Sequence, residues 1–267
     1  MKNDKLKIAE KWYKVLGFPE SFDDELYSAL ETKDIITETI EEYDLECEDG
    51  VSNLLHMLYF CERTSKAYEE KGISHEILID TLKDIVRWTI TWSDVKGSLW
   101  LKELGWLSHH LKLKLFKLGR LQFCFESAHM DYPIAGVKKG DNIVGIHIPS
   151  VGPLDIEECK KSIDLAREFM GNFVPEYEYK IFNCHSWLLD KKLETVLKSD
   201  SNILKFRTLF EMISDEKSDA ILKYIFTWDT TRDNLPEREC TSSFSKAVNG
   251  KVLSGEYFNE SVGIIRK

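Results

Sequence analysis

The segment from Asn142 to Cys184 constrains the fold more than any other part of this sequence. Residues 142–149 form an apolar run that ends at a proline, residues 156–169 carry apolar side chains at helical spacing, and residues 177–184 form a second apolar run. A strand, a helix and a strand in this order join two parallel strands through a right-handed crossover. The segment therefore predicts a sheet with helices packed on it.

The hydrophobic pattern changes at about residue 116. Before this point apolar side chains recur at helical spacing, and signals such as Gly17 and a capping position at Ser74 separate the helices. We expect helices at residues 8–16, 24–30, 35–43, 51–68, 77–91 and 98–109. The chain is therefore predicted to be an α+β protein, with an all-helical N-terminal domain at residues 1–115 and a mixed-sheet α/β domain at residues 116–267.

Further elements are expected in the C-terminal domain. Residues 119–126 alternate polar and apolar side chains, which is typical of a strand with Arg120, Gln122 and Cys124 on one face. We also expect strands at residues 203–213 and 222–228, a turn and helix at residues 185–197, and a short helix at residues 242–249.

Charge and composition narrow the range of partners. The chain has 46 acidic and 36 basic residues, and residues 1–50 alone hold fifteen acids against six lysines. Such a surface repels nucleic acid, so we expect no nucleic-acid partner. No apolar run reaches the length of a membrane span, and the first residues do not resemble a signal peptide. We therefore expect a cytoplasmic protein that has no membrane partner.

The six cysteines indicate reduced thiols. They are scattered along the chain and form no CxxC pair, which is the spacing typical of a structural zinc site. We predict no metal centre from the sequence.

Residues 181–190 carry the densest chemistry in the chain. Ile181 and Phe182 begin an apolar strand, which then runs directly into asparagine, cysteine, histidine, serine and tryptophan. In open α/β sheets ligands bind outside the carboxyl ends of the strands. The polar end of this strand is therefore the first place to expect a functional site, and His147 lies in the preceding strand.

Four short motifs resemble one known family. They are GRLQF at residues 119–123, IHIP with GPL at residues 146–154, CHSWLLD at residues 184–190 and SNILKF at residues 201–206. In this order they resemble the C-terminal half of a bacterial acyltransferase family, which joins a helical N-terminal domain to a GNAT-like C-terminal domain. The resemblance implies a GNAT-like fold and transfer of an acyl group from acyl-CoA or acetyl-CoA, as co-substrate, to a small-molecule acceptor. The acceptor amine or hydroxyl would attack the thioester directly.

The resemblance also implies where the co-substrate binds. In GNAT enzymes a loop between a strand and a helix holds the CoA pyrophosphate with backbone N–H groups. The cofactor-binding candidates are Ile148, Ser150, Val151, Gly152 and Leu154.

Histidines are the candidates for acid–base chemistry, because a histidine side chain ordinarily titrates near neutral pH. The catalytic candidates are His185 and His147, and the substrate-binding candidates are Arg120, Gln122, Ser186 and Trp187. Each candidate also has a structural alternative. A strand histidine can be satisfied by the backbone, Arg120 and Gln122 can lie on an exposed face, Ser186 can cap a helix, and Trp187 can pack in a core.

Two other functions stay open. Residues 148–155 lack the glycine-rich GNAT signature, Asp155 and the two glutamates after it place negative charge at the start of the next helix, and no tyrosine lies between Ser186 and Leu197. These features favour a non-catalytic ligand-binding or regulatory module on a GNAT-like fold. A hydrolase that uses Ser186 or Cys184 with a histidine is the third possibility.

Overall fold

The computed structural model describes residues 2–267 and divides into two compact units. One unit ends at Lys117, and the other runs from Leu118 to Lys267. The first is built from helices and the second on a mixed sheet, so the predicted α+β architecture is confirmed.

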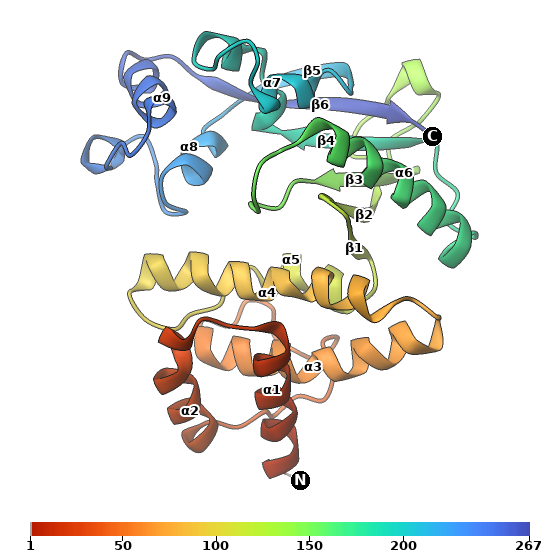
Figure 1. Ribbon diagram of the computed structural model, residues 1–267, viewed down its shortest axis with the longest axis vertical. Helices are drawn as coiled ribbons and strands as arrows, with labels where there is room; N and C mark the ends of the chain where they lie inside the picture. Colours follow the sequence, from red (N-terminus) through yellow and green to blue (C-terminus); the bar gives the residue numbers. More distant parts are fainter. Residues whose placement is uncertain (1) are drawn as a thin grey trace. The chain divides into compact units, whose positions relative to one another are not determined.

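Helices make up the N-terminal unit (Figure 1). They are α1 (Lys2–Leu16), α2 (Asp23–Thr32), α3 (Gly50–Glu70), α4 (His75–Lys96) and α5 (Leu104–Leu111), with a 3₁₀ turn at Glu20–Phe22. The predicted cap at Ser74 is confirmed, because its hydroxyl accepts a hydrogen bond from the Ile77 N–H at 3.3 Å. The same helix ends at Gly97, which adopts the left-handed conformation that glycine tolerates best.

The helix expected at residues 35–43 is wrong. The chain makes turns there, although Ile35, Ile40 and Tyr43 are buried. The Tyr43 ring lies 4.3 Å from the His56 ring, and its hydroxyl donates to Asn53 at 2.8 Å. The apolar spacing therefore reflects burial against α3 and not a helical backbone.

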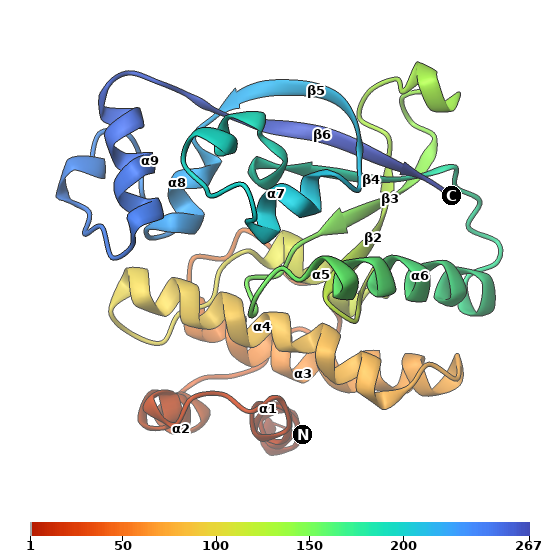
Figure 2. The same cartoon turned by 45° about the horizontal axis from the view of Figure 1, so that its top comes forward.

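A mixed sheet organises the C-terminal unit (Figures 1 and 2). In spatial order its strands are β1 (Leu115–Leu118), β2 (Leu121–Ser127), β3 (Asn142–His147), β4 (Ile181–Ser186), β6 (Phe258–Arg266) and β5 (Glu211–Ser218). Strands β3 and β4 are parallel, and helix α6 (Ile156–Phe173) joins them. The predicted crossover is therefore confirmed.

Different segments cover the two faces of the sheet. Helix α6 lies along one face, where the Arg167 guanidinium stands 5.7 Å from the Phe182 ring (Figure 2). Residues 128–141 cover the opposite face, here called the loop-side face, through an apolar cluster. Its buried members are Ala128, Tyr132, Val137, Ile143, Ile181, Val262 and Ile264. Because side chains alternate along a strand, Cys124, Gly145 and Asn183, which stand opposite one another, all belong to this face.

Several C-terminal elements differ from the sequence prediction. The remaining helices are α7 (Asn202–Arg207), α8 (Ala220–Ile225) and α9 (Ser243–Leu253). The strands expected at residues 203–213 and 222–228 are wrong, because α7 and α8 occupy the first part of each range and β5 begins only at Glu211. Short apolar runs fit a buried helix as well as a strand, and the hydroxyl of Ser201 caps α7 by accepting from the Ile203 N–H.

Two further differences lie near the sheet. Residues 185–197 form 3₁₀ turns at Trp187–Leu189 and Lys191–Thr195 instead of an α-helix. Strand β6 was not expected, yet it lies between β4 and β5. The helix expected at residues 242–249 is confirmed and continues to Leu253.

A second apolar cluster lies under α8 and α9. Its buried members are Trp187, Leu193, Ile221, Leu222, Leu235, Val248, Val252 and Phe258.

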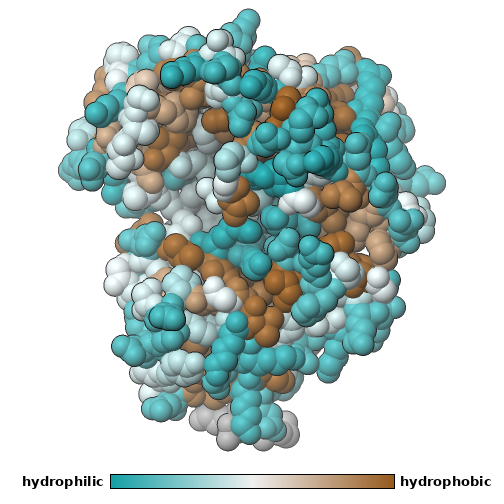
Figure 3. Space-filling view, in the orientation of Figure 1, coloured by the Kyte–Doolittle hydropathy of each residue, from teal (hydrophilic) through white to brown (hydrophobic). Residues whose placement is uncertain are grey.

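On the surface of the C-terminal unit, hydrophobic residues appear as separate patches among hydrophilic ones (Figure 3). Among the described residues, no helix combines the length and apolar character that a membrane crossing requires.

A buried polar network holds α4 and α5 together. Asp84 is 4% exposed, and its carboxylate lies 3.0 Å from His110 Nε2, 2.9 Å from Trp106 Nε1 and 2.8 Å from an Arg87 nitrogen. Burial opposes ionisation of Asp84, but the hydrogen bond and charge of His110 and the Arg87 charge outweigh it and hold its pKa below the usual range.

Replacing Asp84 by asparagine should lower the free energy of unfolding by about 3 kcal/mol at pH 7, since it removes charge-assisted hydrogen bonds inside the protein. The native pKa lies below the unfolded value, so the contribution is full above about pH 4 and is lost as the pH falls. In urea unfolding, the difference in free energy of unfolding between the parent protein and Asp84→Asn should therefore narrow below about pH 4. The matched control is Asp80→Asn on the same helix, which removes only half-exposed ion pairs and should cost less than about 1 kcal/mol.

Candidate functional site

Strands β3 and β4 stop pairing before they end. Their register joins Val144 to Phe182 and Gly145 to Asn183, whereas β3 continues to His147 and β4 continues to Ser186. Within the described residues, the parallel ladder therefore ends two positions before the first candidate histidine. The end of this ladder lies at the sheet edge where α/β proteins bind ligands.

A hydrogen-bonded carboxylate and imidazole lie beside this point. Glu126 Oε1 is 2.7 Å from His147 Nε2, and the two side chains are 32% and 34% exposed. Glu126 stands opposite Ile143 in the ladder, so its carboxylate reaches along β3 and lies over Gly145. A Cβ atom at residue 145 would overlap that carboxylate, so any other residue there would displace Glu126 from its present position.

This pair has the chemistry of a general base. A carboxylate bound to one ring nitrogen selects the tautomer that carries its proton on that nitrogen and stabilises the imidazolium. Partial exposure gives a substrate access to the pair. Gln122 stands opposite His147 and is 2% exposed, and its Nε2 has no hydrogen-bond partner in the part of the chain that the structure describes.

The second candidate base has different surroundings. His185 is exposed, and its ring stacks on His129 with centroids 5.8 Å apart. The Tyr132 hydroxyl accepts a hydrogen bond from Asn183 Nδ2 at 3.0 Å and lies 3.4 Å from His129 Nδ1. Burial, together with the nearby Glu126 charge, raises the pKa of Tyr132 to about 12, so its hydroxyl stays neutral.

Arg120 does not lie on a strand face, so this part of the prediction is wrong. Gly119 and Arg120 form the turn between β1 and β2, where Gly119 has a φ of 67°. From this turn the guanidinium donates to the carbonyls of Pro149, Gly152 and Pro153 at 3.0, 3.4 and 2.9 Å. Arg120 therefore binds the loop that was expected to hold the co-substrate.

The carbonyl contacts fix which backbone N–H groups of the loop point outward. In a trans peptide the carbonyl and the following N–H point in opposite directions. With the Pro149 and Pro153 carbonyls bound to Arg120, the N–H groups of Ser150 and Leu154 point away from the guanidinium. The Val151 N–H instead donates to Pro149 at 2.8 Å, and the Leu154 side chain is buried.

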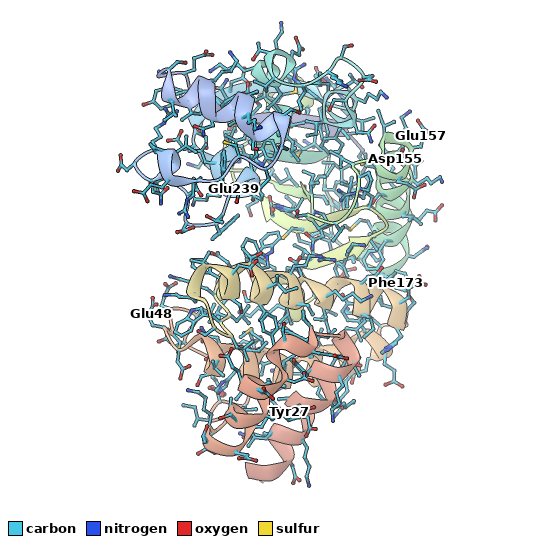
Figure 4. All side chains as sticks on the ribbon, turned by 60° about the vertical axis from the view of Figure 1, so that its left-hand side comes forward. Tyr27, Glu48, Asp155, Glu157, Phe173 and Glu239 are labelled. Atoms are coloured by element: carbon cyan, nitrogen blue, oxygen red, sulfur yellow. The ribbon has the colours of Figure 1, made fainter. Side chains whose placement is uncertain are left out.

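The start of α6 is already capped. Asp155 accepts hydrogen bonds from the N–H groups of Glu157 and Glu158, and Figure 4 shows Asp155 and Glu157 together at this end of the helix with Phe173 at the other. Lys160 and Lys161 each lie 2.8 Å from one of the glutamates. The helix terminus is thus occupied by its own carboxylate, and the loop before it offers the better anion contacts.

The remaining candidates have structural partners. The Ser186 hydroxyl accepts from the Leu188 N–H and caps a 3₁₀ turn. Trp187 belongs to the cluster under α8 and α9. Cys184 is fully buried, and burial raises the pKa of its thiol above the ordinary range, so the thiolate needed for attack is disfavoured. The hydrolase alternative therefore lacks an activated nucleophile.

Neither Glu126 nor Gly145 is among the candidate site residues predicted from the sequence. The one available signal was spacing, since Glu126 follows Gln122 and Cys124 at intervals of two and so shares their face. The contact between the Glu126 carboxylate and Gly145 depends on the β2–β3 register, which alternation alone does not provide.

Comparison with known proteins agrees with this architecture. Residues 115–265 match the family model of a GNAT-like C-terminal domain, and residues 9–113 match that of an N-acyltransferase N-terminal domain. The chain belongs to this two-domain GNAT-like acyltransferase family. No curated protein matches it significantly.

Solved acyltransferase structures share the family fold. One, in complex with decanoyl-CoA, is 25% identical over 79% of this chain and 64% of its own, with a TM-score of 0.69. Another, in complex with decanoyl-CoA and teicoplanin, is 24% identical over 80% of this chain and 66% of its own, with a TM-score of 0.71. A mutant acyltransferase in complex with octanoyl-CoA is 20% identical over 97% of this chain and 87% of its own, with a TM-score of 0.78. The chain thus spans about two thirds of the length of the first two.

The conclusion that Cys184 is not an activated nucleophile can be tested by alkylation of the native protein at pH 8. Cys47 and Cys240 are partly exposed and should react with iodoacetamide, while Cys61 and Cys184, which are buried with raised pKa values, should stay unmodified. Mass spectrometry of tryptic peptides gives the site of modification. Rapid labelling of Cys184 would restore it as a candidate nucleophile, and denatured protein provides the control in which all four react.

Proposed function

We propose that this protein transfers an acyl group from acyl-CoA to an amine or hydroxyl of a small-molecule acceptor, with His147 as general base. The observation that carries the proposal is the partly exposed Glu126–His147 pair beside the point where the pairing of β3 and β4 ends. Family membership supports acyl transfer, and the relatives bound to decanoyl-CoA and octanoyl-CoA support acyl-CoA as the donor.

One residue can serve both proton transfers. His147 takes the proton from the acceptor nitrogen or oxygen while that atom attacks the thioester carbonyl carbon. The new C–N or C–O bond forms and the C–S bond breaks, and the imidazolium, stabilised by Glu126, returns the proton to the departing CoA thiolate. This sequence needs no separate acid, so the absence of a tyrosine between Ser186 and Leu197 does not exclude it.

The loop after β3 is proposed to bind the CoA pyrophosphate through backbone N–H groups. Arg120 holds the loop carbonyls, and the N–H groups of Ser150 and Leu154 point the other way. Arg120 is therefore a positioning residue in this proposal and does not contact the acceptor.

The acceptor is proposed to lie on the loop-side face. The buried Gln122 amide stands opposite His147 with a donor that has no partner among the described residues, and the exposed His185–His129 pair lies on the same face. These groups suit a polar small molecule. We further propose that the protein works in the cytoplasm, where acyl-CoA donors are made.

Removing the carboxylate from His147 should slow catalysis. Glu126→Gln should lower kcat at least about tenfold, because part of the roughly 10²–10⁴-fold effect of a general base is lost. Gly145→Ala should do the same, since its Cβ occupies the place of the Glu126 carboxylate. The double variant should be little slower than either single variant, because both act on one contact.

The matched control is Gly171→Ala in α6, where an added Cβ meets no atom within 4 Å, and its kcat should be unchanged. If the loss of kcat in the double variant equalled the product of the losses in Glu126→Gln and Gly145→Ala, the two substitutions would not act through one contact, and the proposal would be contradicted. Thermal unfolding of each variant separates loss of catalysis from loss of fold.

Calorimetric titration with CoA and a series of acyl-CoAs tests the proposed function, and binding is the expected result. Arg120→Lys keeps the charge but cannot reach three carbonyls, so its Kd for CoA should rise about tenfold or more. Lys160→Ala, on the exposed side of α6, is the control and should bind CoA as the parent protein does. No heat and no thermal shift with any donor would contradict the acyltransferase proposal.

A further inference from the structure

We infer that Cys124, Glu126 and His147 form a binding site for a divalent cation of the zinc type. The thiol sulfur, a carboxylate oxygen and a ring nitrogen of these residues all lie within 4.8 Å of one another. Sulfur, nitrogen and oxygen from these side chains are the ligands that zinc prefers. The cation would be an inhibitor and not a cofactor, because it occupies the base.

The three ligand atoms converge over Gly145. Cys124 stands opposite Gly145 across the β2–β3 ladder, the Glu126 carboxylate lies over Gly145, and His147 Nε2 is 2.7 Å from that carboxylate. All three come from regular strands, so their backbone positions are fixed by the ladder hydrogen bonds. The missing Cβ of residue 145 provides the space in which they meet.

The three ligand atoms need to move only slightly closer together to bind a zinc ion. Zinc binds sulfur at about 2.3 Å and nitrogen or oxygen at roughly 2.0–2.2 Å, so its tetrahedral ligand atoms stand roughly 3.3–3.7 Å apart. Starting from separations of at most 4.8 Å, a closure of about 1 Å or less per side chain suffices. Glu126 and His147 are partly exposed and give a cation a path to the buried thiol.

A second observation beside the cluster indicates an unmet polar contact. Gln122 is buried opposite His147, and its Nε2 has no hydrogen-bond partner in the described chain. Water bound to a three-ligand zinc ion would complete the tetrahedron, and its oxygen would offer an acceptor to a neighbouring amide donor. The cluster thus presents three ligands and an adjacent donor suited to the fourth.

Metal binding itself does not depend on the proposed function, whereas inhibition does. The direct test is titration of the metal-free protein with Co²⁺ alone, followed by optical absorption. A thiolate-to-cobalt charge-transfer band and visible bands of tetrahedral intensity are expected, and Zn²⁺ should displace both. An absence of the charge-transfer band in the parent protein would overturn the inference.

Variants identify the ligands. Cys124→Ser should lose the charge-transfer band, and Glu126→Gln should keep the band but raise the apparent Kd about tenfold or more, since even an outer-shell change costs about 10–100-fold. Cys159→Ser removes another buried thiol of the same unit and should leave the titration unchanged. A band that survives in Cys124→Ser, or disappears in Cys159→Ser, would contradict the assignment.

The inhibitory consequence has its own readout. Zn²⁺ should inhibit acyl transfer by the parent protein, and the concentration for half inhibition should rise at least about tenfold in Cys124→Ser relative to that variant's own activity. If Co²⁺ binds with the charge-transfer band but Zn²⁺ does not inhibit acyl transfer, the metal site is supported and the role of His147 as the base is contradicted. Zinc inhibition without the thiolate band would place the inhibitory ion elsewhere.

Discussion

The reach of Glu126 across Gly145 to His147 determines what the loop-side face can do. Two strands supply the residues, and the β2–β3 register sets their separation. Tyr177 fixes the backbone at Glu126, because its hydroxyl lies 2.8 Å from the carbonyl oxygens of both Glu126 and Ile143. Its ring also stacks on the Phe125 ring, with centroids 4.5 Å apart. A side chain at residue 145 would break this arrangement, because its Cβ would overlap the Glu126 carboxylate.

The loop after β3, which is proposed to bind the CoA pyrophosphate, contains a single glycine. In the glycine-rich type, backbone freedom lets N–H groups turn toward the ligand. Here Arg120 binds the carbonyls of Pro149, Gly152 and Pro153 and so sets the direction of the intervening N–H groups. The proposed anion contact therefore depends on a side chain from the β1–β2 turn and not on the loop's own composition.

The sequence predicted the parts of the fold that local patterns specify. The crossover from β3 through α6 to β4 and the Ser74 cap were predictable, because periodicity and capping residues act over a few positions. The β6 strand and the helices α7 and α8 were not, because short apolar runs fit either structure until the rest of the sheet is placed. For the site, alternation grouped Gln122 with Cys124, but only the register shows that Glu126 passes over Gly145.

Both histidines at the ends of β3 and β4 are candidates for the base, and their surroundings differ in one respect. His147 is bound to a carboxylate, whereas His185 stacks on another imidazole. The most direct measurement is therefore kcat for His147→Ala and His185→Ala with the same acyl-CoA and acceptor. The account predicts a loss of about a hundredfold or more for His147→Ala and less than about tenfold for His185→Ala. The reverse order, or full activity in both variants, would contradict it.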